Sequence, residues 1–204
     1  DRSSESATVT GAYCAFTCAV LIWGWVETAF LLGYVTGPRT SASPPGSNEW
    51  QRFLHAVQAI AYHELAIVVA AMIVVLLTDG APNQVGTWTF MILWVMRLSA
   101  KLNLFLGVRN LGEEFLPERL RYLRSFFLKR PMNLLFPISV TVATILAGIL
   151  WTEAAAPTAS PFDTASLTLA ATLLSLAILE HWFMVLPLPT TALWSWGLRS
   201  RDAR

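Results

Sequence analysis

The sequence predicts an all-α fold, a polytopic membrane helix bundle with about five transmembrane helices and one interfacial amphipathic helix. Hydrophobic residues make up 55% of the chain and charged residues only 13%, against roughly a quarter charged in soluble domains. Apolar runs of roughly 20 residues recur, each long enough to cross a hydrocarbon layer about 30 Å thick. Connections rich in arginine and lysine alternate with connections that have none, as successive membrane spans require. The chain is therefore predicted to be a single membrane domain with spans at about residues 9–35, 50–78, 84–109, 134–154 and 165–186.

The first two spans are bounded by local sequence signals. Gly11, Ala15 and Ala19 form a small-residue stripe at four-residue spacing, which predicts close contact with another helix. Gly37 and the serine-rich stretch after it end the first span. The second span is rich in β-branched residues and stops at the turn formed by residues 79–83.

The later spans differ in polarity. The third holds Arg97, Lys101 and Asn103 within an otherwise apolar run, whereas the fourth is almost wholly apolar. The fifth is broken by Pro187 and Pro189, since proline cannot continue a helix. The charged side chains of the third span are therefore expected to contact partners on the other helices.

The basic residues of the connections predict the orientation. Arg39 and Arg52 lie between the first two spans, whereas residues 79–83 and the connection between the last two spans carry no base. Short cytoplasmic loops collect positive charge. The start of the chain is therefore predicted outside and the C-terminus in the cytoplasm, with further bases in the tail at Arg199, Arg201 and Arg204.

Residues 117–129 are predicted to form the interfacial helix. Pro117 suits its first position, and Leu116, Leu120, Leu123 and Phe127 recur at helical spacing. Such a helix lies in the membrane surface. Its bases would anchor it to membrane lipids or offer a docking surface to a partner protein, and the pattern leaves both open. The bases concerned are Arg119, Arg121, Arg124, Lys129 and Arg130.

Ionisable residues within the spans predict a buried polar layer, because charges inside a bilayer must face protein or water and find partners. One interpretation is an ion-pair and hydrogen-bond network in which Arg97, Lys101 and Asn103 meet the acids. A second is a metal or pigment site, and a third is a quinone or proton pathway. The candidate metal ligands are Glu27, His63, Glu64, Glu180 and His181.

The two histidines are the candidate cofactor ligands. Histidine and carboxylate bind iron, zinc or manganese, and histidine can ligate the metal of a tetrapyrrole such as (bacterio)chlorophyll. His63 precedes Glu64, and His181 follows Glu180, which makes a mirrored pair. Neighbours on a helix point about 100° apart, so at most one member of each pair should face a common centre. The cofactor itself is not specified by this pattern.

Motifs of soluble enzymes are absent from the sequence. It has no phosphate-binding glycine loop, no nucleophile elbow and no HExxH zinc motif. The net charge of +1 gives no broad basic surface for nucleic acid. Cys14 and Cys18 are four residues apart and are expected to be packing residues. These observations favour a non-enzymatic role.

Several motifs along the chain are long or unusual. They are GAYC at residues 11–14, YHELA at 62–66, PNQVG at 82–86, LGVRNLGEEFLP at 106–117, RYLRSFF at 121–127, RPMNLLFP at 130–137 and LEHWFMVLPLP at 179–189. Together they resemble the PuhE family of photosynthetic complex assembly proteins. The resemblance spans nearly the whole chain and is most specific in its second half. Family members begin with further apolar sequence, and because the first residue is Asp1, the chain is expected to lack a preceding N-terminal segment.

The resemblance implies a multi-pass protein of the bacterial inner membrane, cytoplasmic or intracytoplasmic, in phototrophic bacteria. It implies a role as an assembly factor for photosynthetic complexes or in bacteriochlorophyll biosynthesis. The oxygen-dependent (aerobic) cyclase of that pathway is the partner it suggests. The family offers no catalytic residues to carry over.

Three functional hypotheses remain. The first is a non-catalytic assembly or scaffold subunit whose basic interfacial helix docks a partner. The second is a cofactor-bearing membrane protein, with His63 and His181 as ligands. The third, a transporter for protons or a small organic ion, ranks last because inverted repeats are not evident.

Overall fold

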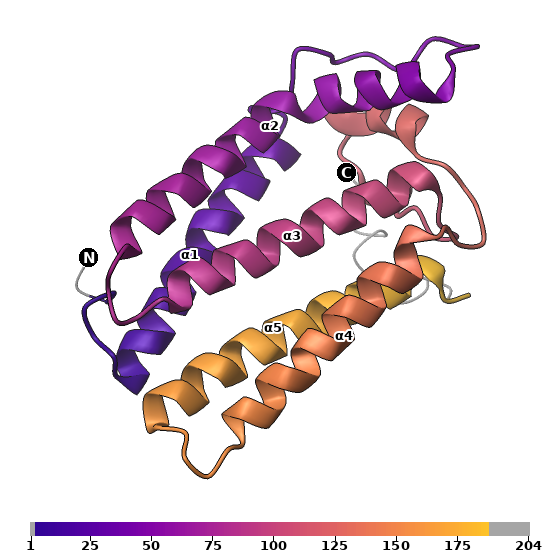
Figure 1. Ribbon diagram of the computed structural model, residues 1–204. Helices are drawn as coiled ribbons and strands as arrows, with labels where there is room; N and C mark the ends of the chain where they lie inside the picture. Colours follow the sequence, from indigo (N-terminus) through magenta and orange to yellow (C-terminus); the bar gives the residue numbers. More distant parts are fainter. Residues whose placement is uncertain (1–2, 188–204) are drawn as a thin grey trace, which may run out of the picture.

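Five α-helices dominate residues 3–187, the part of the chain that the computed structural model describes (Figure 1). All five are long and apolar enough to cross a membrane. The all-α fold with five membrane spans is therefore confirmed, while the tail bases Arg199, Arg201 and Arg204 lie outside the described residues. The helices are α1 (Val9–Leu31), α2 (Glu49–Thr78), α3 (Val85–Leu106), α4 (Leu135–Ala154) and α5 (Pro161–Val185).

Side-chain caps fix where three of the helices begin. Thr8 Oγ1 accepts a hydrogen bond from the Gly11 amide at the start of α1. A capping box formed by Asn48 and Gln51 opens α2, and α5 has its own capping box with proline at the first turn. That box, at Ser160 and Asp163, starts α5 four residues before the predicted boundary, which hydropathy alone had placed at residue 165.

The end of α1 also differs from the prediction. The apolar run continues to residue 35, but the helix ends at Leu31. Gly33 adopts a φ of 76°, and the amide of Tyr34 bonds back to the Ala29 carbonyl at 3.0 Å. This closure satisfies carbonyls of the last helical turn, as a left-handed glycine does in a Schellman motif.

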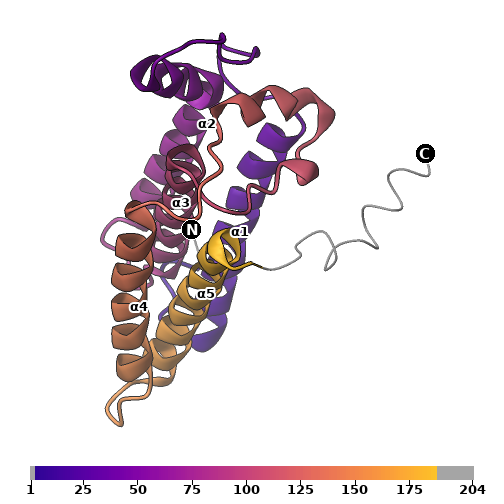
Figure 2. The ribbon, with the colours of Figure 1, turned by 90° about the vertical axis from the view of Figure 1, so that its right-hand side faces the viewer.

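Helix α3 lies at the centre of the bundle. It contacts α1 and α2 on one side and α5 and α4 on the other, and α4 packs mainly on α5 (Figures 1 and 2). The predicted small-residue stripe of α1 is confirmed, since Gly11, Ala15 and Ala19 are buried. A Cβ added at Gly86 of α3 would lie 3.5 Å from the Ala15 carbonyl oxygen. Small residues thus allow α1 and α3 to approach closely.

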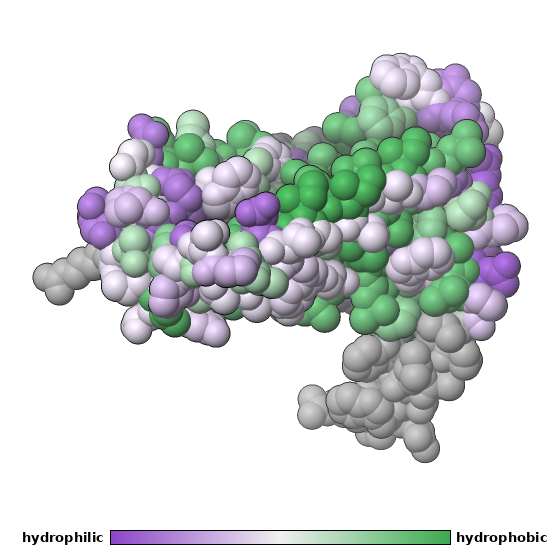
Figure 3. Space-filling model, turned by 60° about the horizontal axis from the view of Figure 1, so that its bottom comes forward, coloured by the Kyte–Doolittle hydropathy of each residue, from purple (hydrophilic) through white to green (hydrophobic). Residues whose placement is uncertain are grey.

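Large apolar side chains cover much of the outer surface. Figure 3 shows a hydrophobic surface between hydrophilic patches toward the ends of the view. Trp25, Leu76 and Ile138 are among the exposed side chains. In a membrane these groups contact lipid, which explains why so little of each helix is buried within the protein.

The predicted interfacial helix is shorter than expected and of another kind. Residues 113–126 contain two 3₁₀ segments, η1 (Glu113–Phe115) and η2 (Glu118–Phe126), in place of one α-helix over 117–129. A 3₁₀ helix repeats every three residues, so Leu120, Leu123 and Phe126 form the buried row, and Phe127 is only partly buried. This row packs against Phe30 of α1 and Ala59 of α2. The apolar face of η2 is thus covered by the protein itself.

Candidate functional site

The backbone after α1 runs against α2 and positions the candidate site. The His63 amide donates to the Thr36 carbonyl at 2.9 Å, and the Arg39 amide donates to the Gln58 carbonyl at 3.5 Å. Backbone inserted into a helical hydrogen-bond ladder bends the helix, and Figure 1 shows α2 bent near its first third. Gly37 is required here, because a Cβ would lie 2.0 Å from the Gln58 carbonyl oxygen. The loop thereby holds His63 beside the end of α1.

His63 lies fully buried between α1 and α2. Its ring stacks on Phe30, with centroids 4.3 Å apart and an interplanar angle of 29°. Nε2 lies 3.4 Å from Oε1 of Glu27, a close polar contact that lacks the geometry of a hydrogen bond. Neither ring nitrogen of His63 has a hydrogen-bond partner among the described residues.

Arg97 of α3 lies between α1 and α5 and contacts an acid on each of them. Its Nη2 lies 3.5 Å from Glu27 Oε2 on α1, and its Nη1 lies 3.4 Å from Glu180 Oε1 on α5. The side chain of Glu27 is 14% exposed, that of Arg97 37% and that of Glu180 57%. Exposure thus increases outward from His63 toward the surface of the bundle.

Lys101 forms a separate pair one helical turn away. Its Nζ lies 2.6 Å from Oε1 of Glu64 on α2, and both side chains are mostly buried. The same ammonium lies 6.0 Å from the centre of the Phe30 ring. The two predicted bases therefore bind different acids, and α1, α2, α3 and α5 all contribute to one polar layer.

His181 belongs to a second polar chain between α3, α4 and α5. Its Nδ1 lies 2.9 Å from the Ala177 carbonyl oxygen, and its Nε2 lies 2.9 Å from Ser99 Oγ. Ser99 Oγ in turn donates to Ser139 Oγ on α4 at 2.9 Å. Both ring nitrogens of His181 therefore contact hydrogen-bonding groups of the protein.

Asn103 extends this chain toward the connection between α3 and α4. Its amide donates to the Ser99 carbonyl at 2.9 Å, and its own oxygen accepts from Asn133 at 3.0 Å. Asn133 also donates to the Gly107 carbonyl and accepts from the first amides of α4. Asn103, which the sequence placed among the buried charges, here bonds only to neutral groups among the described residues.

The structure does not bring the five candidate metal ligands to one point. Glu27 meets His63, but Glu64 is bound by Lys101, Glu180 meets Arg97, and His181 meets Ser99. In both mirrored pairs the histidine is buried and the glutamate points elsewhere, as the 100° between helix neighbours requires. Among residues 3–187, no three His, Cys, Asp or Glu side chains are arranged to hold a metal ion.

Most of the five bases predicted to form a lipid or partner surface have partners within the chain. Arg119 donates to the Leu32 carbonyl, and Arg124 binds the Glu113 carbonyl at 2.8 Å. Arg121 pairs with Glu118 in the preceding turn at 2.6 Å, Arg130 lies 4.0 Å from Glu49, and Lys129 is exposed. Two of these bases, Arg119 and Arg130, thus contact the end of α1 and the start of α2.

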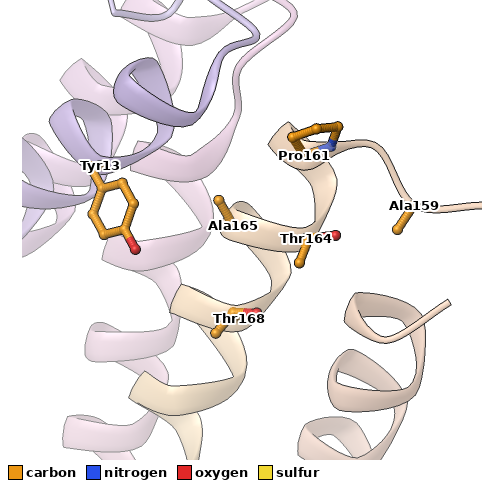
Figure 4. A pocket seen from close by; sticks show the side chains of 6 residues that line it. All are labelled: Tyr13, Ala159, Pro161, Thr164, Ala165 and Thr168. Carbon is orange, nitrogen blue, oxygen red and sulfur yellow. The ribbon is translucent and has the colours of Figure 1, made fainter. Parts of the chain in front are cut away.

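Two hollows differ in chemistry. A cleft of about 150 Å³ lies between α1, α3 and α5 and contains Glu27, Arg97 and Glu180. A larger, shallow depression of about 470 Å³ lies near the starts of α1 and α5 (Figure 4). Thr168, on its rim, is twelve residues from Glu180, roughly 18 Å along the helix. The depression has no charged lining residue and lies away from the polar layer.

With this geometry established, comparison with known proteins defines the family. Residues 1–204 match DUF3623, described as a protein of unknown function. The chain belongs to the DUF3623 family. A relative of this DUF3623 protein in Rhodobacter capsulatus is named "Uncharacterized 30.4 kDa protein in puhA 5′ region". The two are 44% identical over 199 residues, which is 98% of this chain and 72% of the relative. No solved structure matches the chain at a significant level.

Sequence reasoning missed several organising residues of this DUF3623 protein. Asn110 donates to the carbonyls of Phe183 and Leu186 at 2.7 Å each, and so caps the end of α5. Ser99 and Asn133 link the helices around His181. All three are small polar residues within or beside apolar spans, and that is the signal that would have found them.

Proposed function

We propose that this protein is a non-catalytic membrane assembly factor, of the PuhE type, for bacterial photosynthetic complexes or bacteriochlorophyll biosynthesis. The observation that carries the proposal is the 44% identical relative, which is named for its position in the puhA 5′ region of a photosynthetic bacterium. Its place is the bacterial inner membrane, cytoplasmic or intracytoplasmic, with the C-terminus in the cytoplasm.

The pairing of the buried charges supports a scaffold. Arg97 contacts acids of α1 and α5, and Lys101 contacts an acid of α2. An ion pair inside a bilayer strongly disfavours separation of the helices that carry it, since each charge alone is costly there. The layer therefore holds four helices in one arrangement, as a docking platform requires.

The basic end of the bundle is the proposed docking face. It consists of the start of α2 and the connection between α3 and α4, which Arg52 joins by donating to the Phe126 carbonyl at 3.0 Å. Arg121 and Lys129 are exposed there. The proposed partner is a photosynthetic assembly or pigment-biosynthesis protein, with the oxygen-dependent (aerobic) cyclase as the first candidate. Membrane lipids would contact the same bases.

The test uses a double charge reversal, Arg121→Glu with Lys129→Glu, in the phototrophic host. Neither residue ties the segment to α1 or α2, and the exposed pair of Arg121 with Glu118 contributes little stability. Glu153→Lys, at the opposite end of the bundle, is the control. We expect cyclase co-purification to fall about tenfold or more in the double variant only. Full retention would refute docking on these bases, and absence of any pigment-synthesis or photosynthetic protein from the wild type would refute the assembly role.

A second candidate function, a protein that bears a metal or a (bacterio)chlorophyll-type tetrapyrrole, is favoured by one observation. Both ring nitrogens of the buried His63 lack hydrogen bonds, whereas both nitrogens of His181 are used. Metal analysis and an optical spectrum of protein purified from the phototrophic host test it. A bound group lost in His63→Ala and kept in His181→Ala supports a site at His63. Metal-free, colourless wild-type protein refutes the candidate.

A further inference from the structure

The cleft between α1, α3 and α5 opens through the side of the bundle. Helices α1 and α5 form two walls of the cleft and pack together near their starts, where Ala12 and Ala15 of α1 lie in one cluster with Phe162 and Ala165 of α5. They diverge toward the other end (Figures 1 and 2), and α3 contacts both of them. The charges lie roughly 6 to 14 Å along the helix axes from the ends of α1, α3 and α5, within the apolar spans.

Among residues 3–187, the charges that line this cleft do not balance. Glu27 and Glu180 supply two carboxylates, and Arg97 supplies the guanidinium between them. The neighbouring base Lys101 is already paired with Glu64. Glu180 is 57% exposed in a region where the surroundings are lipid. An exposed carboxylate at this depth is costly unless another group covers it.

Buried groups behind the cleft point to the same conclusion. Oε1 of Glu27 is buried without a hydrogen-bond partner, and so is Nε of Arg97. His63, which is fully buried, directs Nε2 to within 3.4 Å of Glu27. The polar side chains around the cleft thus keep capacity for further contacts.

Size and charge limit the occupant. The volume of about 150 Å³ is below the roughly 300–1,000 Å³ of ordinary ligand and cofactor pockets. An anionic lipid headgroup would meet two carboxylates for one guanidinium. A second copy of this chain offers no spare base within the described spans, because Arg52, Arg97 and Lys101 all have partners. A single cationic side chain on a neighbouring transmembrane helix meets both conditions.

We propose that this cleft docks a transmembrane helix of a partner protein, which inserts a lysine or arginine side chain beside Glu180. The base lies about 10 Å from the cytoplasmic end of the partner helix, level with the carboxylates. The apolar part of that helix covers Leu173 and Ala177 of α5, which line the cleft. The inference rests on the proposed assembly role only for the identity of the partner.

Site-specific photo-crosslinking in membranes of the phototrophic host tests the docking. A benzophenone amino acid replaces Leu173 in the cleft or, as the control, Ile145 on the exposed face of α4. We expect Leu173 to crosslink to a transmembrane segment that mass spectrometry shows to contain a lysine or arginine. Crosslinks only to lipid, to another copy of this chain or to a segment without a base would overturn the proposal.

Charge exchange tests whether the ion contact drives the docking. Glu180→Gln should lower the crosslink yield about tenfold or more, the range expected for loss of a charge-assisted bond. Glu180→Lys should abolish the crosslink, and a glutamate in place of the partner's base should restore it. A restored crosslink would show that the Glu180→Lys variant folds. If the crosslink were not restored although the variant eluted normally, the proposed contact between Glu180 and the partner's base would be refuted. If Leu173 crosslinked to a transmembrane segment that contains a lysine or arginine but belongs to a protein unrelated to photosynthesis, the docking in the cleft would be supported. Only the assembly role would then be refuted.

Discussion

The contact between Gly37 and α2 provides a sharp test of how the site is built. In Gly37→Ala, the added Cβ would lie 2.0 Å from the Gln58 carbonyl oxygen and 2.7 Å from the Ala59 carbonyl carbon. Both atoms are helical backbone, so the loop must withdraw. Withdrawal removes the bond from the His63 amide to the Thr36 carbonyl.

The cost follows from two effects. A buried amide left without its partner costs about 1–3 kcal/mol, and overpacking adds about 1–3 kcal/mol. We expect Gly37→Ala to lower the free energy of unfolding by about 2–6 kcal/mol, or Tm by on the order of 10 °C for a chain of this size. The amide of His63 should also exchange with solvent faster.

The assay is thermal unfolding in mild detergent, with hydrogen exchange read at His63. Gly24→Ala is the matched control, because a Cβ there meets nothing within 4 Å. That change should raise stability by about 0.5–1 kcal/mol, since glycine is unfavourable within a helix. The reasoning would be wrong if Gly37→Ala were as stable as the control and the exchange at His63 stayed unchanged.

Three further outcomes are expected. Lys101→Met should lower the free energy of unfolding by about 2 kcal/mol, a value between those of surface and fully buried ion pairs. Adding Glu64→Gln should restore most of that free energy. If the losses of the two single variants simply added in the double variant, Lys101 and Glu64 would not interact. Asn110→Ala should lower the free energy of unfolding by about 1–2 kcal/mol and speed amide exchange in the last turn of α5. Unchanged exchange there would show that Asn110 does not cap the helix. Burial raises the pKa of Tyr122 above its ordinary value near 10. Stability should therefore fall as alkaline pH passes that raised pKa, and this part of the loss should disappear in Tyr122→Phe.

Hydropathy was sufficient to predict the number and order of the spans, but not where each ends. The first span was predicted too long because residues 32–35 are apolar, yet Gly33 closes the helix before them. The fifth was predicted too short because Ser160 and Asp163 are polar, although together they form the cap. Caps and left-handed glycines depend on individual residues, which an average over a window of hydropathy conceals.

The members of the polar layer could be predicted because charges within apolar spans are few. Their partners could not, because the rotation of each helix about its axis is set by packing. Arg97 contacts α1 and α5, whereas Lys101, one turn later, contacts α2. The backbone contact of the preceding loop with α2 at His63 was also not predicted, because it depends on no side-chain pattern.

The placement of the charges has a consequence for the order in which the helices enter the membrane. The first two helices bring Glu27 and Glu64 into the bilayer, and the bases that bind them arrive only with the third helix. Helices that leave the translocon one by one would expose these acids to lipid in the interval. Insertion of α1, α2 and α3 is therefore expected to be cooperative, with the hairpin of α1 and α2 held at the translocon until Arg97 and Lys101 emerge from the ribosome.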